Sequence, residues 1–221
     1  MANEAGLDEV FLIEDSMINF QDAFNTLKDE GLSLRFGLRI NVCNDRTEEK
    51  KESSYKIILS PLNDMGCKQL YQIFTKIFSD PANDSHADIE LLRGCNHSEI
   101  AVMHPFYDSY LYNNAMYFKN CMWDSFVPED REIFLLEENA HPHDALIKQM
   151  VMQDKKRRIQ LVKSIFYRLR SDVEAYQTYR MSTQRSFGRV EGLTNPNIEH
   201  FGSREFCFQS YMDYHGKTVK I

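Results

Sequence analysis

The sequence has no apolar run long enough to cross a lipid bilayer and no segment typical of a secretory signal. Its apolar runs, such as Val10–Ile13 and Ile133–Leu136, are four residues long, whereas a membrane-spanning helix needs about 20 residues. The acidic N-terminus lacks the basic stretch with which a signal peptide begins. Nine glycines and six prolines are too few for a low-complexity chain. We therefore expect a globular protein that does not enter membranes.

Cysteine usage and motif content exclude several further classes. The five cysteines, at positions 43, 67, 95, 121 and 207, are odd in number, widely spaced and without a C-x-x-C pair. This usage is typical of reduced thiols in a cytosolic or nuclear protein. The sequence also lacks G-x-S-x-G, a Gly-rich phosphate loop, H-E-x-x-H and an EF-hand loop. We expect no cofactor and no catalysis; a metal-dependent enzyme with scattered site residues stays an alternative.

Charge is distributed unevenly along the chain. Residues 1–140 carry 12 Lys and Arg against 25 Asp and Glu, whereas residues 141–221 carry 14 against 8. Within 148–189, 11 basic residues stand against three acidic ones. A basic cluster on an acidic protein can bind nucleic acid, an acidic partner or its own acidic half. A nucleic-acid-binding protein that uses a basic helix over 148–189 is therefore an alternative function, although interleaved aromatic and Gly-rich binding signatures are missing.

The strongest periodic signal predicts one long helix over about 145–181. Apolar residues spaced 3, 4, 3, 4 and 3 positions apart mark one face of a helix; they are Ile159, Val162, Phe166, Leu169, Val173 and Tyr176. Phe166 lies at the edge of this apolar arc, next to Lys163 and Arg170. A large aromatic residue at a charged margin indicates contact with a partner, and ordinary core packing is the other interpretation.

Other elements are predicted by alternation and by turn residues. Leu32–Val42 alternates apolar with polar residues, which is typical of a half-buried strand. The charged stretch 44–53 predicts a mobile loop. Helices are expected over 15–30 and 64–79, strands at 55–59, 100–103, 131–138, 205–211 and 217–221, an irregular segment at 186–202, and either helix or strand within 106–126. This order of elements predicts one α+β domain over 1–221.

Two groups of residues have spacings that can hold a metal ion. Cys95-x-His97 and His141-x-His143 are i, i+2 pairs, and four such ligands could bind zinc. His86-x-Asp88-x-Glu90 could supply ligands to a harder metal. The first spacing is not a recognised zinc-module signature, and surface histidines in turns are the alternative. No lysine follows the second group at the spacing of a nuclease site, and a solvated loop is the alternative, so we expect no bound metal.

Three short segments, in the same order, resemble the comet-type HORMA-fold adaptors of the spindle assembly checkpoint. The strand and helix over Tyr55–Ser79 contain Gly66-Cys67-x-Gln69, which resembles a Gly-Cys-x-Gln element of the family's first strand and helix. The strand Glu132–Leu136, a polar loop and the long helix resemble the family's central region. Phe208-Gln209 followed by Gly216-Lys217 resembles its terminal strands. The matches cover about a third of the chain, and Cys207 replaces a tryptophan of the family pattern.

The resemblance implies a fold, a function and a set of contacts. The implied fold is a single HORMA-like domain with a mostly antiparallel sheet and a long central helix over about 145–181. Members of the family are non-enzymatic adaptors that bind a closed HORMA checkpoint protein and deliver it to a hexameric AAA+ ATPase, which silences the checkpoint in mitosis and meiosis. The implied location is the nucleus and cytoplasm, including the spindle or kinetochore. Phe166 is the implied anchor of the partner interface, surrounded by Val162, Lys163, Arg170 and Ile159.

Overall fold

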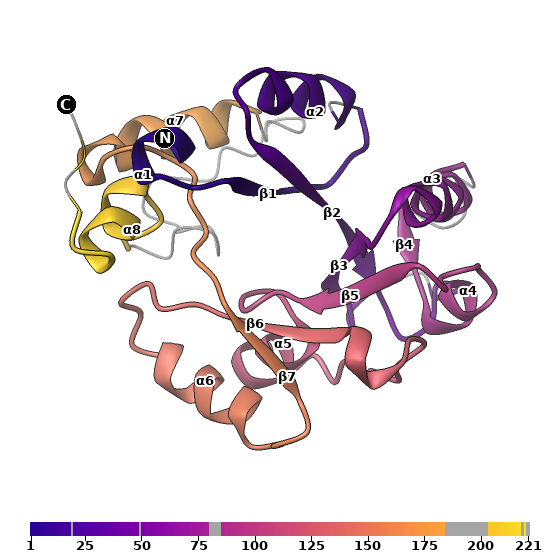
Figure 1. Cartoon of the computed structure of the whole chain (residues 1–221). Helices are drawn as coiled ribbons and strands as arrows, with labels where there is room; N and C mark the ends of the chain where they lie inside the picture. Colours follow the sequence, from indigo (N-terminus) through magenta and orange to yellow (C-terminus); the bar gives the residue numbers. More distant parts are fainter. Residues whose placement is uncertain (19, 49, 80–84, 184–202, 218, 220–221) are drawn as a thin grey trace. The chain divides into compact units, whose positions relative to one another are not determined.

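The computed structural model describes residues 1–18, 20–48, 50–79, 85–183, 203–217 and 219, and these form two compact units (Figure 1). The sheet unit comprises Leu7–Leu136 and Ile147–Gln160. The small unit comprises Met1–Gly6, Glu137–Leu146 and Leu161–Ile221. Among the described helices, none has the length and apolar character needed to cross a membrane.

The sheet unit is built on a mixed β-sheet, which confirms the α+β class but not the mostly antiparallel pairing that we expected. Strands run in the order β1-β2-β3-β5-β6-β7, and β4 pairs with β2 beside this path. The β2–β3 and β3–β5 pairs are antiparallel, whereas β1–β2, β2–β4 and β5–β6 are parallel. The described strands are β1 (Glu9–Glu14), β2 (Ser33–Val42), β3 (Tyr55–Pro61), β4 (His86–Ala87), β5 (Ile100–His104), β6 (Glu132–Leu136) and β7 (Arg158–Leu161).

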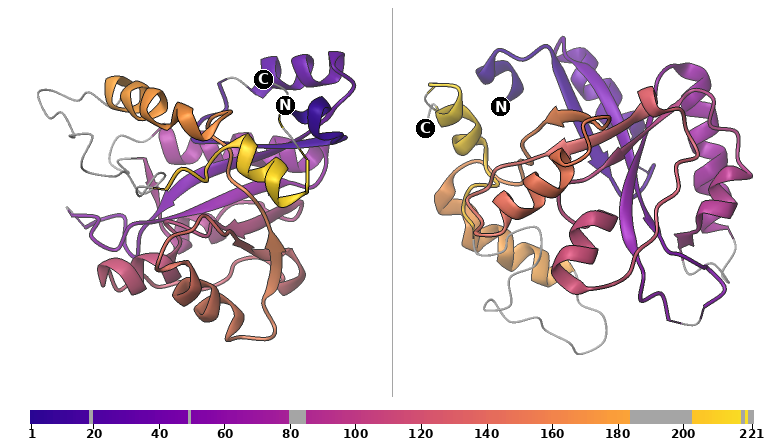
Figure 2. Two further views of the ribbon diagram at one scale, coloured as in Figure 1. Left: turned by 90° about the vertical axis from the view of Figure 1, so that its left-hand side faces the viewer. Right: turned by 90° about the horizontal axis from the view of Figure 1, so that it is seen from below.

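Helical crossovers explain the parallel pairs, because parallel strands cannot be joined by a tight turn. Helix α2 connects β1 to β2, and α5 lies in the connection from β5 to β6. Helices cover both faces of the sheet, with α3 on one face and α5 on the other (Figure 2). The described helices are α1 (Ala2–Ala5), α2 (Phe20–Asp29), α3 (Asp64–Phe78), α4 (Ile89–Arg93), α5 (Tyr110–Tyr117), α6 (Asp144–Met152), α7 (Val173–Thr183) and α8 (Phe208–Tyr214), with short 3-10 turns η2 (Glu129–Arg131) and η3 (Arg170–Asp172).

The core of the sheet unit follows the alternation of β2. Phe36, Leu38, Ile40 and Val42 are buried on one face, as the sequence predicts. They form one cluster with residues of β3 and with the inward face of α3, which is lined by Leu70, Ile73 and Ile77. Helix α3 begins where we expected it, because the Asn63 side chain accepts a hydrogen bond from the Gly66 N–H at 3.0 Å. Helix α2 was also predicted, although it begins at Phe20 rather than at Asp15.

The predicted long helix over 145–181 does not form. In its place the chain makes α6, the strand β7, an extended stretch, the turn η3 and α7. Asp154 turns the chain after α6, since its side chain accepts from the Lys156 N–H at 3.0 Å. Four consecutive basic residues, 155–158, follow this turn, and a helix would bring Lys155 and Arg158 side by side, where like charges repel one another. From Ile159 a different set of apolar residues lies on alternate positions, which favours an extended chain: Ile159, Leu161, Ile165, Tyr167 and Leu169.

The predicted C-terminal strands are also wrong. Residues 205–211 end in helix α8, whose N-terminus is capped by the Cys207 thiol at 3.4 Å from the Ser210 N–H. The alternating burial of an extended chain stops there, and Phe208 and Met212 lie one helical turn apart as buried residues. Lys217 and Val219 are not in a strand. Residues 186–202, where we expected irregular structure, lie outside the described residues.

Candidate functional site

The expected partner-binding residues lie on two different units. Phe166, Val162, Lys163 and Arg170 belong to the small unit, whereas Ile159 lies on β7 in the sheet unit. The first three are on an extended stretch over 161–169, and Arg170 begins the turn η3 that follows it. The structure therefore brings four of the five residues onto one continuous segment, which is extended rather than helical.

Phe166 is half-buried and forms part of an aromatic cluster in the small unit. Its ring is stacked on Tyr176 of α7, with centroids 5.6 Å apart and an interplanar angle of 7°. It also contacts Phe206 at 5.7 Å, and the Phe166 N–H donates to the Phe206 carbonyl at 3.0 Å. Val162 on the same segment is half-buried. These contacts hold the extended segment against α7 and the residues that precede α8.

Lys163 and Arg170 are held by acidic and carbonyl groups within the small unit. The Lys163 ammonium donates to the Asn139 side-chain oxygen at 2.6 Å and to the Glu138 carbonyl at 3.0 Å. Burial lowers the pKa of Lys163, although nearby Glu137 opposes this shift. Arg170 forms two ion pairs, with Glu205 at 2.8 Å and with Asp213 at 2.6 Å. Hydrogen bonding from Arg170 lowers the pKa of Glu205 to about 2.

A buried carboxylate, Glu137, fixes the start of the extended segment. It accepts from the Ser164 hydroxyl at 2.8 Å, from the Ser164 N–H at 3.1 Å and from the Asn139 amide at 3.0 Å. Burial raises the pKa of Glu137 in spite of these donors. Sequence reasoning missed this network, because its members lie 24 to 27 positions apart and no motif connects them.

Two apolar side chains of the same segment point away from the small unit's interior. Leu161 is 71% exposed and Ile165 is 37% exposed, whereas Tyr167 is buried. Leu161 and Ile165 therefore present apolar surface to solvent, whereas the rings of Phe166 and Tyr167 pack against Tyr176. The helical interpretation missed this surface, because it assigned the segment to the middle of a packed helix.

The metal candidates are engaged in packing and capping. His141 and His143 are stacked with centroids 5.1 Å apart in the small unit, whereas His97 packs against Phe126 in the sheet unit. Cys95 donates its thiol to the Leu91 carbonyl at 3.3 Å. In the remaining group, Asp88 caps α4 by accepting from the Leu91 N–H at 2.8 Å, and His86 contacts the Ser54 hydroxyl at 3.1 Å. Across the described residues, no three His, Cys, Asp or Glu side chains converge closely enough to hold a metal.

A second cluster that sequence reasoning missed surrounds His104 in the sheet unit. Its Nε2 lies 2.9 Å from Glu132, which also accepts from the indole of Trp123 at 2.8 Å. The His104 ring is stacked on Phe134 at 4.4 Å and meets Trp123 edge-on at 4.5 Å. Burial lowers the pKa of His104, so a neutral imidazole donates to the carboxylate. With 1% of His104 exposed, the cluster is enclosed and stabilises the sheet rather than offering a reactive group.

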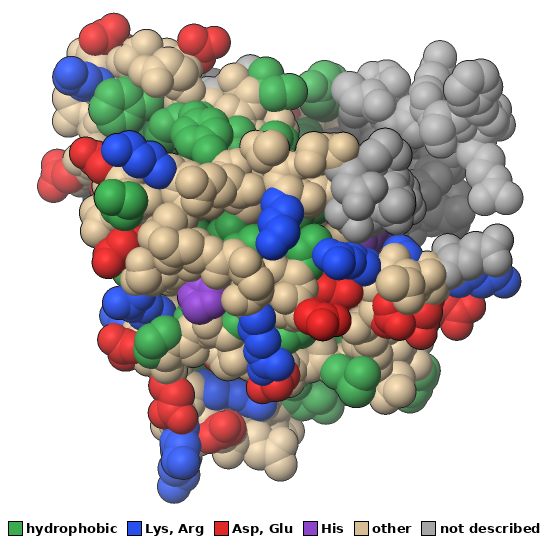
Figure 3. Space-filling model, turned by 90° about the vertical axis from the view of Figure 1, so that its right-hand side faces the viewer, with side chains coloured by type: hydrophobic (Ala, Val, Ile, Leu, Met, Phe, Trp, Pro, Cys, Tyr) green, Lys and Arg blue, Asp and Glu red, His purple; other side chains and the backbone are tan. Residues whose placement is uncertain are grey.

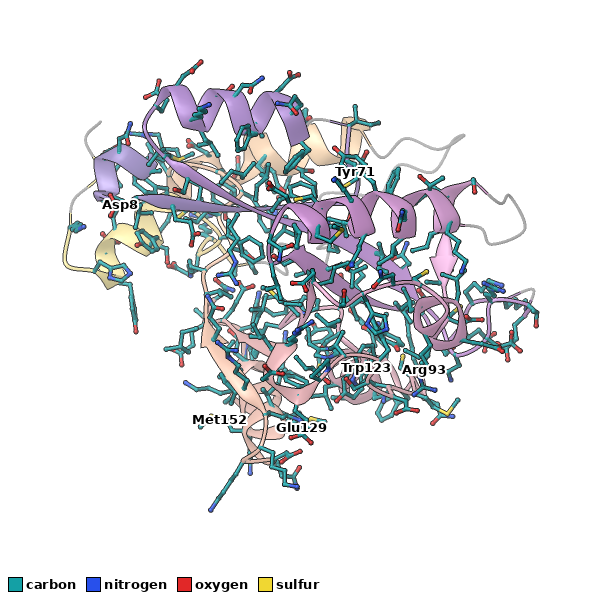
Figure 4. All side chains as sticks on the ribbon, turned by 45° about the vertical axis from the view of Figure 1, so that its right-hand side comes forward. Asp8, Tyr71, Arg93, Trp123, Glu129 and Met152 are labelled. Atoms are coloured by element: carbon teal, nitrogen blue, oxygen red, sulfur yellow. The ribbon has the colours of Figure 1, made fainter. Side chains whose placement is uncertain are left out.

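The sheet unit also contains an open cleft of about 740 Å³, whose lining includes Arg46, Arg93 and Asp124; Arg93 is labelled in Figure 4. Four of its six charged groups form ion pairs, since Arg46 contacts Asp88 at 3.7 Å and Arg93 contacts Asp124. Lys, Arg, Asp and Glu side chains are intermixed over the face of the unit that carries α3 and α4 (Figure 3). The cleft is lined by four acidic and two basic side chains, and we assign it no ligand.

The Gly66–Gln69 element has a structural explanation in this fold. A Cβ at Gly66 would lie 2.2 Å from the Glu99 carbonyl oxygen, so only glycine allows the helix to approach this loop. The Gln69 side chain donates to Ser98 at 3.0 Å and accepts from the Glu99 N–H at 3.1 Å. The element therefore attaches the start of α3 to the loop before β5.

Comparison with known proteins adds no identification. No protein-family model matches the sequence, and no match was found among curated protein sequences. The resemblance to HORMA adaptors therefore stays a prediction.

Proposed function

We propose that this protein is a non-enzymatic adaptor that binds a protein partner through the extended segment 161–169 of the small unit. The observation that carries the proposal is the pair of exposed apolar side chains, Leu161 and Ile165, on a segment that the unit holds rigidly. Removing a leucine or isoleucine side chain from water contributes about 1.5–3 kcal/mol. A segment that is ordered before binding loses less conformational entropy when a partner covers these side chains, which favours affinity.

The segment is pre-organised by contacts on its inner side. Glu137 accepts hydrogen bonds from Ser164, and the Phe166 ring is stacked on Tyr176 and contacts Phe206 at a tilt. Lys163 and Arg170 are held by acidic and carbonyl groups, so their charges form a fixed rim. In this proposal Leu161 and Ile165 contact the partner, while Phe166 supports the segment and contributes its exposed edge.

The specific partner that we propose is a closed HORMA checkpoint protein, which the adaptor delivers to a hexameric AAA+ ATPase to silence the spindle checkpoint. Support for this choice comes from the first resembling segment, since β3 and α3 carry the Gly66–Gln69 element at the expected strand–helix junction. The second and third segments give less support, because the central helix and the terminal strands of the family pattern are absent from the described residues.

Calorimetry tests the proposal. It measures binding of the full chain to a purified checkpoint HORMA protein that is locked in its closed form. We expect Leu161→Ser/Ile165→Ser to weaken the complex at least 30-fold, equivalent to about 2 kcal/mol. Tyr214→Ser is the matched control, because Tyr214 is an exposed apolar residue on α8 (77% exposed) outside the segment. It should leave the affinity within twofold.

Two outcomes would overturn the proposal, at different levels. No binding to the closed protein, by itself or together with the AAA+ ATPase, removes the checkpoint partner. Binding that is equally strong in the wild type and in the Leu161→Ser/Ile165→Ser variant removes the segment as the docking surface.

A further inference from the structure

The sheet has two edge strands whose charges are opposite. β1 and β7 are the first and last strands of the described sheet path. An edge strand presents unpaired N–H and C=O groups that can pair with another strand. Proteins usually protect such an edge with a proline, a lysine, a bulge or a very short strand.

The β1 edge has none of the protective features except charge at its ends. Its central residues, Val10–Ile13, are all apolar and half-buried. Acidic residues flank them on both sides, with Asp8 and Glu9 before and Glu14 after, all exposed. In the part of the chain that the structure describes, neither Glu9 nor Glu14 forms an ion pair. The edge is therefore an apolar strand between two negative ends.

The β7 edge has the opposite charge. Arg158, Ile159 and Gln160 are all exposed, and the exposed residues Lys155 and Lys156 come just before the strand. The Arg158 side chain donates to the Asp130 carbonyl at 2.7 Å, which leaves its positive charge in place. This edge thus has an exposed isoleucine and three basic residues.

We propose that β1 of one copy pairs with β7 of a second copy, so that the sheets of two molecules join edge to edge. Pairing β1 with another β1 in antiparallel register would place Glu9 opposite Glu14. Two β7 strands would bring their basic residues together in parallel register, and in antiparallel register they would gain no contact between opposite charges. Like charges directly opposite each other destabilise a strand pair, whereas opposite charges stabilise it. Because β1 is acidic at both ends, it meets the basic end of β7 in either strand direction.

This contact is heterologous, since it uses a different surface on each molecule. A heterologous contact does not close with two copies and leads to a ring or an open chain. Only four residues form β7, so the buried area is small and the association depends on concentration. It also weakens with salt, because the charges at both edges are exposed.

Sedimentation velocity of the full chain at low salt, over a range from micromolar to about 500 μM, tests this assembly. The wild type should sediment progressively faster with concentration. Glu9→Lys/Glu14→Lys makes both edges basic, and Lys155→Glu/Lys156→Glu makes the basic edge acidic. Each variant alone should stay monomeric, with an unchanged far-UV circular dichroism spectrum.

An equimolar mixture of the two variants should associate again, because each altered edge then meets an edge of opposite charge. A wild type that stays monomeric at 500 μM overturns the proposal, as does association that either single-edge variant leaves unchanged. Slow hydrogen exchange, in the dilute monomer, of the β1 amides that face away from β2 also overturns it, because another part of the same chain then covers this edge.

Discussion

Replacing Gly66 by alanine should destabilise the sheet unit by about 2–4 kcal/mol. The new Cβ would lie 2.2 Å from the Glu99 carbonyl oxygen, a backbone atom that cannot rotate away. Overpacking of this kind costs about 1–3 kcal/mol. A shift of α3 would relieve this clash, but it would weaken the hydrogen bond between the Asn63 side chain and the Gly66 N–H. An N-cap bond of this kind contributes about 1 kcal/mol to stability. The total is a large fraction of the 5–15 kcal/mol that stabilises a typical domain.

Urea unfolding, monitored by tryptophan fluorescence, measures the stability of the sheet unit. Trp123 is the single tryptophan, and it lies in the sheet unit, as Gly66 does. With a slope of about 2 kcal/mol per molar urea, the transition midpoint should fall by about 1–2 M at an unchanged slope.

Two other glycines give matched controls for the same substitution. Gly94→Ala should change stability by less than about 0.5 kcal/mol, because its nearest neighbour, the Leu91 carbonyl, lies 3.4 Å from the added Cβ. Gly37→Ala should fall between the two, since its closest neighbours are side-chain rather than backbone atoms, the Cγ2 methyl of Ile58 at 2.6 Å and the Phe11 ring at 3.1 Å. Equal stability of Gly66→Ala and Gly94→Ala would show that the Glu99 carbonyl does not restrict position 66.

Three further predictions concern titration and packing. Burial lowers the pKa of His104 in the folded protein. Its contribution to stability is therefore complete above the pKa of an unfolded histidine, about 6.5, and is lost as the pH falls below that value. The urea midpoint of the wild type should drop more between pH 7 and pH 5 than that of His104→Asn, and equal drops would contradict this. Arg170 lowers the pKa of Glu205 to about 2. The Arg170–Glu205 pair therefore stabilises the small unit fully above pH 4.5, and this stability is lost as the pH falls toward 2. Arg170→Met should flatten this pH dependence, measured by far-UV circular dichroism, and an unchanged dependence would disprove the pairing. Phe166→Ala should cost the small unit about 2 kcal/mol and still leave it folded in a thermal melt, whereas complete unfolding at room temperature would make Phe166 a core residue and not part of an interface.

Strong local periodicity made β2 and α3 predictable. β2 alternates over ten residues, and α3 has a capping residue, an apolar face and a clear end. The predicted helix over 145–181 was wrong because residues 159–169 also carry apolar side chains on alternate positions, a pattern that suits an extended chain. The run of basic residues after Asp154 favours the extended form. β1 was missed as a strand because Val10–Ile13 is short and apolar on both faces, which periodicity alone cannot assign.

The candidate site was less predictable than the fold, because it depends on contacts between distant residues. Phe166, Lys163 and Arg170 were identified from the sequence, but their partners Tyr176, Asn139 and Glu205 were not. The exposure of Leu161 and Ile165 could not be predicted, because it depends on the extended backbone of this segment. No sequence pattern connects Glu137 with Ser164, since the hydrogen bonds between them depend on tertiary structure.

The small unit joins residues from both ends of the chain, and this sets the order in which the protein can fold during synthesis. Glu4 pairs with Arg168 at 2.8 Å, and the Ala5 carbonyl accepts from the Lys217 ammonium. The first six residues leave the ribosome long before either partner has been made. The sheet unit has all of its strands once Leu161 has emerged, whereas the contact of Lys217 with Ala5 in the small unit forms only after residue 217 has been made. A ribosome stalled before residue 203 would therefore carry a folded sheet unit with an N-terminal segment that still lacks its C-terminal partner.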